Sequence, residues 1–149
     1  MTTPAGYSGK PLPAKLGLKP GHVVYVDGGP PHTDELLGGT PYTTRLPKRA
    51  DVTLLFSTER SRLEKRLPLV VGRTVTDGMV WVCWPKKAAK VATDLDENVV
   101  RRIGLDLGVV DVKVAAVDQT WSELKFVRRL ADRPDAAFWY AVAYAEGVR

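Results

Sequence analysis

The order of hydrophobic and polar residues along the chain predicts five strands. Each candidate is a short apolar run, rich in β-branched residues and bounded by glycine, proline or polar residues, as is typical of buried strands. These runs lie at residues 22–27, 51–57, 79–84, 109–117 and 124–129. Residues 42–46 predict a further short edge strand, closed by Pro47. The Asp77-Gly78 pair is expected to form a turn before the third run, which Pro85 ends.

The hydrophobic period changes to that of a helix in two longer segments. Residues 58–72 carry an apolar stripe, and Pro68 within it predicts a kink or a break. The stripe consists of Leu63, Leu67, Val70 and Val71. A second stripe, closed by Gly108, consists of Val99, Val100, Ile103 and Leu107. Asp94 and Glu97 have the spacing of a capping box, so we expect Asp94 to cap this second helix.

Shorter helical segments are predicted towards both ends of the chain. Residues 11–18 form a helical turn, and a brief helix around Glu35 is capped by Thr33 or Asp34. Residues 134–146 predict a final helix with aromatic residues on several sides. Such a helix has to be buried against the rest of the domain, a second copy of the chain or another protein. Docking on the sheet is favoured and a homodimer through residues 134–146 is the alternative, so monomer and homodimer both stay open.

The alternation of strands and helices predicts one α/β domain with a Rossmann-like, mostly parallel sheet and helices on both faces. The last two strands are expected to be antiparallel, because their connection is too short for a crossover. We expect a flexible arm at residues 1–10, the domain itself at residues 11–130 and a C-terminal helical extension at residues 131–149.

Composition narrows the functional classes without selecting one. The 149 residues include a single cysteine, which excludes an internal disulfide. The sequence contains neither a long apolar stretch nor a signal segment, so a cytoplasmic protein is expected. The net charge of +5 favours anionic partners. Nucleic acid is one of these, but charge alone supports it, because no recognition motif accompanies the charge.

The order of the elements resembles an abbreviated class I methyltransferase, whose Rossmann-like sheet has a reversed last strand. The resemblance covers roughly residues 16–130. Lys19-Pro20-Gly21 precedes a strand that ends in Asp27-Gly28-Gly29, and Asp77-Gly78-Met79 opens a later strand. A helix and an antiparallel hairpin follow. This resemblance implies the architecture and, as one alternative, a small methyltransferase that uses S-adenosylmethionine.

Three strings also resemble an actinobacterial family of small proteins, a domain of unknown function. The strings are GYSGKPLPAKLG at 6–17, WPKKAAKVATDL at 84–95 and VDVKVAAVDQTWSELKFVRR at 110–129. They are long and unusual, and the tail from residue 130 lies outside the resemblance. This second resemblance implies the fold and supplies no activity.

The first candidate site is the turn after the first strand, Asp27-Gly28-Gly29. In nucleotide-binding sheets this turn approaches the cofactor with bare backbone. Pro30 and Pro31 follow the glycines here and remove two N–H donors. The end of the next predicted strand, at residues 43–46, also lacks the acidic residue that would bind a ribose. A tight turn without a cofactor is therefore favoured over cofactor binding.

The second candidate site follows the third strand. Its members are Trp84, Lys86, Lys87, Lys90 and Thr93. In open α/β sheets ligands bind outside the carboxyl ends of the strands, and an indole with lysines can hold an anionic group or a ring. We expect Lys86 and Lys87 to be exposed and Trp84 to be at least half buried. The alternative is a core tryptophan beside solvated lysines.

A third candidate lies between the last two strands and contains Trp121, Ser122 and Lys125. Polar turn residues are normal in a hairpin loop, but Trp121 is not a turn former. It either packs against the end of the sheet or offers an aromatic surface beside the lysines. In both cases the loops after Asp27, Ser57, Trp84 and Asp118 should meet on one side of the molecule.

Catalytic arrangements are almost absent from the sequence. His32 is the better placed of two histidines, yet no G-x-S-x-G serine accompanies it. Cys83 is expected to be a buried apolar residue in mid-strand. Neither a metal nor a cofactor is predicted. The sequence thus favours a non-enzymatic binding or regulatory module that engages a small anionic ligand or a protein partner, with the methyltransferase and a nucleic-acid-associated factor as alternatives.

Overall fold

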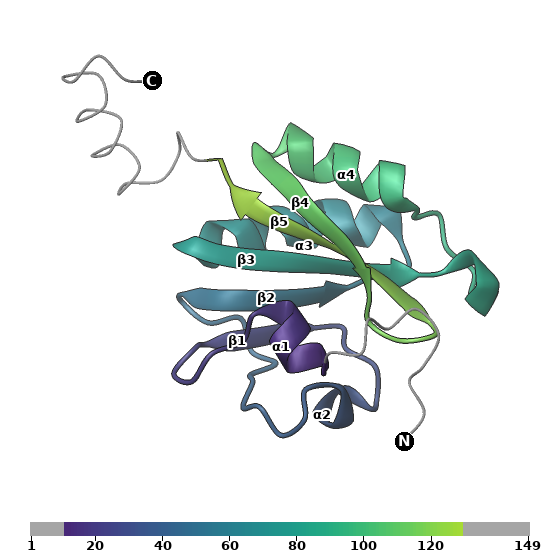
Figure 1. Cartoon of the computed structure of the whole chain (residues 1–149). Helices are drawn as coiled ribbons and strands as arrows, with labels where there is room; N and C mark the ends of the chain where they lie inside the picture. Colours follow the sequence, from purple (N-terminus) through teal and green to yellow (C-terminus); the bar gives the residue numbers. More distant parts are fainter. Residues whose placement is uncertain (1–10, 130–149) are drawn as a thin grey trace, which may run out of the picture.

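The computed structural model describes residues 11–129, which form one five-stranded sheet with helices on both faces (Figure 1). Along the sheet the strand order is β1-β2-β3-β5-β4. The strands are β1 (Val24–Asp27), β2 (Ala50–Phe56), β3 (Thr74–Pro85), β4 (Val109–Ala116) and β5 (Trp121–Arg128). The first three are parallel neighbours, and β5 is antiparallel to both β3 and β4. The predicted mostly parallel sheet with an antiparallel closing hairpin is therefore confirmed.

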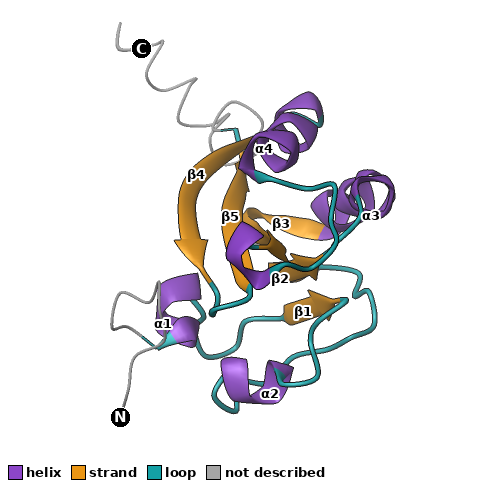
Figure 2. Cartoon of the chain, turned by 90° about the vertical axis from the view of Figure 1, so that its right-hand side faces the viewer, coloured by secondary structure: helices purple, strands orange, loops and turns teal. Residues whose placement is uncertain are grey.

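Helices cover the two faces of the sheet unequally (Figure 2). The longer helices, α3 (Arg60–Arg73) and α4 (Glu97–Asp106), pack on one face. The shorter helices, α1 (Leu12–Leu16) and α2 (Thr33–Leu36), pack on the other. Strand alternation divides the core accordingly, because Trp84 faces α4 whereas Trp81 and Cys83 face α1.

The outer edge of β1 carries a remnant of a further strand. Thr43 forms a single parallel bridge with Tyr25. The Thr43 amide donates to the Val24 carbonyl at 2.8 Å, and the Val26 amide donates to the Thr43 carbonyl at 2.9 Å. The predicted edge strand at 42–46 is thus reduced to one bridging residue. The chain reaches one side of β1 at Thr43 and then crosses to β2 on the other side, so the strand order reverses at β1.

The kink or break predicted at Pro68 and the turn predicted at Asp77-Gly78 are both absent, because each segment lies inside a continuous helix or strand. Helix α3 runs through Pro68 without a break, because Leu63, Leu67 and Val70 remain buried on its sheet-facing side. Asp77-Gly78 does not form a turn before β3 but lies in a bulge within it, where the pairing jumps from Ala50–Thr74 to Val52–Met79. Glycine is required there, since a Cβ on Gly78 would lie 2.7 Å from the Asp51 carbonyl oxygen.

Helix capping also differs from the prediction. Asp96, not Asp94, caps α4, because its Oδ1 accepts a hydrogen bond from the Val99 amide at 2.8 Å. Asp94 instead accepts from the Arg60 amide at 2.7 Å, at the start of α3. Thr33 and Asp34 lie inside α2, whose N-cap position is His32 without a side-chain cap. The arm 1–10 and the predicted helix 134–146 lie outside the described residues.

Candidate functional site

The carboxyl ends of the parallel strands and the β4–β5 hairpin meet along one edge of the sheet, which we call the rim. It comprises the loops at 28–32, 57–59, 86–96 and 117–120. The Lys86 amide donates to the Thr120 carbonyl at 2.8 Å, and His32 Nε2 lies 2.9 Å from Asp118 Oδ2. The predicted convergence of the four loops is confirmed.

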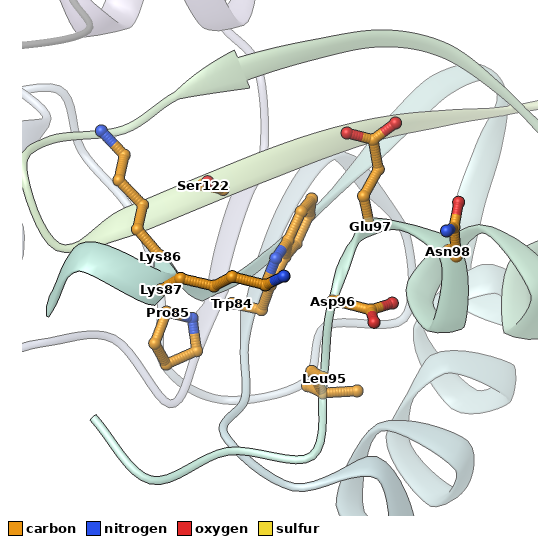
Figure 3. Close-up of a pocket in the computed structure, with 9 residues that line it drawn as sticks. All are labelled: Trp84, Pro85, Lys86, Lys87, Leu95, Asp96, Glu97, Asn98 and Ser122. Carbon is orange, nitrogen blue, oxygen red and sulfur yellow. The ribbon is translucent and has the colours of Figure 1, made fainter. Parts of the chain in front are cut away.

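A pocket of about 320 Å³ opens at the rim between the end of β3, the start of β5 and the N-terminus of α4 (Figure 3). Trp84, which is only 5% exposed, lies at its base. The residues that line it are Trp84, Pro85, Lys86, Lys87, Leu95, Asp96, Glu97, Asn98 and Ser122. Four of the predicted site residues are therefore brought together: Trp84, Lys86, Lys87 and Ser122.

The two lysines of the pocket differ in exposure and direction. Lys87 is exposed and belongs to a short 3₁₀ turn (Lys87–Ala89), and its side chain extends towards α4 (Figure 3). Lys86 is half-buried rather than fully exposed as predicted, because its backbone is tied to Thr120, and its side chain extends away from α4. Within residues 11–129, neither ammonium forms an ion pair.

The opposite wall of the pocket is acidic and comes from the first turn of α4. Glu97 Oε2 pairs with Arg101 Nη2 at 2.6 Å, and Arg101 Nε pairs with Asp111 Oδ2 at 2.8 Å. The hydrogen bond from Arg101 lowers the pKa of Asp111. These contacts anchor α4 to β4. Asp96, Glu97 and Asn98 were not among the predicted site residues, although the predicted start of a helix directly after the lysine loop was a usable signal.

Two further predicted site residues lie on the rim but outside this pocket. Thr93 Oγ1 donates to the Thr58 carbonyl at 2.6 Å and accepts from the Leu95 amide, so it ties the loop before α4 to the loop before α3. Lys90 is exposed and adopts a left-handed backbone with φ of 56°. Neither residue lines the pocket.

Trp121 and Lys125 lie on the other face of the sheet, facing α1. Trp121 packs edge-to-face on Phe56 with ring centroids 5.0 Å apart, and the Lys125 ammonium lies 5.8 Å from the Trp81 ring. The cause is the register of β5, which begins at Trp121 and so sends Trp121 and Lys125 to one face and Ser122 to the other. Trp121 therefore has the packing role that was one of its two predicted alternatives.

The glycine turn after β1 is filled by side chains of α3. The Asp27 carboxylate, which is buried, pairs with Arg62 and with Arg66, whose Nε lies 2.7 Å from Asp27 Oδ2. Arg62 Nη1 also donates to the Phe56 carbonyl at 2.8 Å. A Cβ on Gly28 would lie 2.8 Å from that same carbonyl oxygen. Asp27 and Gly28 are thus occupied by contacts within the chain.

His32 and Asp118 form a polar pair that bridges the first loop to the hairpin. Asp118 Oδ1 accepts from the amides of Thr120 and Trp121 at 2.8 and 2.9 Å, which fixes the carboxylate. Cys83 is fully buried, and burial raises the pKa of its thiol well above the ordinary value. Residues 11–129 contain no group of three histidine, cysteine or acidic side chains that could hold a metal ion.

The strand order, in which antiparallel β5 lies between β3 and the edge strand β4, places the chain among Rossmann-like folds of the methyltransferase type. It is similar to magnesium protoporphyrin IX methyltransferase from Synechocystis PCC 6803 with bound SAM, at 13% identity and a TM-score of 0.56 over 78% of this chain and 74% of that one. The mitomycin 7-O-methyltransferase MmcR gives a TM-score of 0.55 at 11% identity, over 73% of this chain and 50% of that one.

A third similar structure is the ribosomal protein L11 methylase from Lactobacillus delbrueckii subsp. bulgaricus, with a TM-score of 0.50 at 10% identity over 78% of this chain and 74% of that one. At such identities the similarity establishes the fold alone. Neither a family model nor a curated protein matches the sequence. The resemblance to the small actinobacterial family therefore stays a prediction. Among the helices within residues 11–129, none is long and apolar enough to cross a membrane.

Proposed function

We propose that this protein is a ligand-binding module of the methyltransferase fold that holds a small anionic group in the pocket at the rim. The observation that carries the proposal is that Lys87 and the buried Trp84 line one pocket at the rim (Figure 3). A pocket of about 320 Å³ is large enough for a small ligand. The position beyond the carboxyl ends of the strands is where open α/β sheets bind ligands.

The charges that are unpaired at the rim support an anion more than a cation. Lys86 and Lys87 make no ion pair within the described residues, whereas Glu97 pairs with Arg101 and Asp96 accepts the cap bond from the Val99 amide. The N-terminus of α4 also faces the pocket and carries a partial positive charge. A carboxylate or phosphate that enters beside Trp84 thus meets an ammonium and a helix N-terminus.

The double substitution Lys86→Ala and Lys87→Ala tests this proposal. We expect the free energy of unfolding to change by no more than about 1 kcal/mol, because Lys87 is exposed and the half-buried Lys86 is held by a backbone hydrogen bond to Thr120 that alanine retains. Binding of phenylpropanoate or inorganic phosphate, followed by shifts of the Trp84 indole and Asn98 amide resonances, should be weakened at least about tenfold. Lys48→Ala and Lys65→Ala together serve as the matched control, since both lysines are exposed and lie outside the pocket. Unchanged affinity in the folded pocket variant would refute the proposal.

A second candidate function is methyl transfer from S-adenosylmethionine. The three similar structures described above support it, since they are methyltransferases and one of them holds SAM, and they give no support to a non-enzymatic role. The residues of this chain oppose it, because Asp27 is paired with two arginines and the turn after β1 is closed by two prolines.

Calorimetric titration with S-adenosylmethionine separates the two candidates. The ligand-binding proposal predicts no heat attributable to a micromolar site at the glycine turn. Micromolar binding that is abolished by Gly28→Val, and preserved in the Lys86→Ala, Lys87→Ala double variant, would establish the methyltransferase candidate instead. The Gly28 substitution is informative because a side chain there would collide with the Phe56 carbonyl and Arg62. Gly21→Val is its control, since Gly21 shares the positive φ but has nothing within 4 Å of a Cβ.

A further inference from the structure

We infer that the rim pocket takes a zwitterion, specifically an α-amino-acid group with its ammonium and carboxylate side by side. The inference rests on the proposed function and narrows it from anions in general to one ligand class. Its basis is the charge pattern of the pocket, in which one wall is cationic and the facing wall is anionic (Figure 3).

The two walls belong to different elements, and the lysine ammonium groups of one wall stay separate from the carboxylates of the other. Lys86 and Lys87 follow β3, whereas Asp96 and Glu97 begin α4. Although all four side chains line one pocket, none of the lysine nitrogens lies within 4.0 Å of an Asp96 or Glu97 oxygen. The Lys87 side chain extends towards the space beside these two carboxylates without closing it. Opposite charges that face a shared gap favour a ligand that carries both signs.

Each wall retains unused hydrogen-bonding capacity. Asp96 uses Oδ1 for the Val99 amide, and Glu97 uses Oε2 for Arg101, so each carboxylate keeps one oxygen free for an ammonium. The cap bond to Val99 leaves the amides of Glu97 and Asn98 without a partner in the helix, since the first N–H groups of a helix have no intrahelical acceptor. These amides and the Lys87 ammonium suit a carboxylate.

Ligands of a single sign fit this pattern less well. A phosphate dianion gains from Lys87 but is repelled by the carboxylates of Asp96 and Glu97. An amine gains from the carboxylates but is repelled by Lys87. A zwitterion satisfies both walls at once, and its uncharged side chain can lie against Trp84 and Pro85, which are buried at the base of the pocket.

Three probes that share the phenylethyl skeleton and differ in the charged groups attached to it test this inference. They are L-phenylalanine, its deaminated acid phenylpropanoate and its decarboxylated amine phenethylamine, each titrated into the full chain at pH 7 while amide and indole resonances are followed. We expect L-phenylalanine to bind at least about tenfold more tightly than either single-charge probe, because it makes one additional charge-assisted contact. The shifts should concentrate on the Trp84 indole and on the amides of Lys87 and Asn98.

Substitutions in each wall show which side chain binds the carboxylate of the ligand and which binds its ammonium group. Lys87→Met should weaken L-phenylalanine and phenylpropanoate but not phenethylamine, and Glu97→Gln should weaken L-phenylalanine and phenethylamine but not phenylpropanoate. Lys90→Met and Glu64→Gln are the matched controls, because neither residue lines this pocket. If phenylpropanoate binds as tightly as L-phenylalanine, the inference is wrong and the anion-binding function stands. If no probe, inorganic phosphate included, shifts the pocket resonances, both are wrong.

Discussion

Replacing Glu123 by glutamine is expected to stabilise the protein at pH 8 by about 3 kcal/mol and to leave it nearly unchanged at pH 4. Glu123 lies in β5 opposite Cys83, is fully buried, and neither carboxylate oxygen has a hydrogen-bond partner within residues 11–129. Burial raises its pKa from 4.5 to about 7, and the charges of Lys15 and Lys113 offset only part of this effect.

The direction of the pH dependence follows from this raised pKa. A carboxyl group that binds its proton more tightly in the folded state contributes most to stability below pH 4.5, where it is protonated in both states. That contribution is lost as the pH rises from 4.5 to about 7, because the carboxylate is then ionised in the unfolded chain and has to take up a proton on folding. Each pKa unit corresponds to about 1.4 kcal/mol, which gives the expected difference of about 3 kcal/mol.

Urea denaturation of both proteins between pH 4 and pH 9 measures this effect. The wild-type free energy of unfolding should decline across that interval relative to the Glu123→Gln variant, and the two curves should run parallel above pH 8. Glu35→Gln, which removes an exposed carboxylate from α2, is the control and should follow the wild type. Curves for wild type and Glu123→Gln that stay parallel from pH 4 to pH 8 would show that Glu123 is solvated in the folded protein.

The substitution Gly104→Ala is expected to lower the free energy of unfolding by about 2 kcal/mol, within the usual range for overpacking a core. Gly104 lies in α4 against β5, and a Cβ there would lie 2.1 Å from Phe126 Cε1. Phe126 is 1% exposed, so its ring has no room to move aside. Helix propensity alone predicts the opposite sign, since alanine stabilises a helix interior by about 1 kcal/mol over glycine.

Gly72→Ala in α3 is the matched control, because nothing lies within 4 Å of a Cβ at that position. We expect it to stabilise the protein by about 0.5 to 1 kcal/mol. Thermal or urea unfolding of the two variants should therefore shift in opposite directions. The double variant Gly104→Ala, Phe126→Leu should recover part of the loss, which identifies the ring as the cause. Equal stabilisation by both alanines would contradict the close packing of α4 on β5.

The position of the acidic wall of the rim pocket depends on the same packing of α4 against β5. Helix α4 carries the acidic wall of the pocket, and the contact between Gly104 and Phe126 sets how closely this helix approaches the sheet. The Arg101 pairs with Glu97 and Asp111 hold the same helix at its N-terminal end. We therefore expect Gly104→Ala to weaken ligand binding at Glu97 in addition to its effect on stability.

Local sequence patterns were sufficient to predict the elements of this fold and part of the site. Apolar runs marked four of the five strands to within three residues, and they marked β3 only from Met79 onwards. The stripe through Leu63, Leu67 and Val70 located α3 despite Pro68. These features are local, because a buried strand or helix face requires apolar residues at its own period. The lysines after Trp84 were also predictable, since the carboxyl ends of parallel strands share one edge.

Only the tertiary structure decided how the pocket is completed and what fills the glycine turn. The acidic wall depends on which of Asp94 and Asp96 caps α4, and that was settled by the contact of Asp94 with the start of α3. Trp121 lies outside the predicted site because β5 begins three residues earlier than its apolar run indicates. Strand alternation then places the Trp121 ring on the face of the sheet opposite the pocket, against Phe56. Arg62 and Arg66 reach Asp27 across 35 and 39 residues of sequence. Contacts at such separations depend on how α3 is placed against β1, which no local pattern in the sequence encodes.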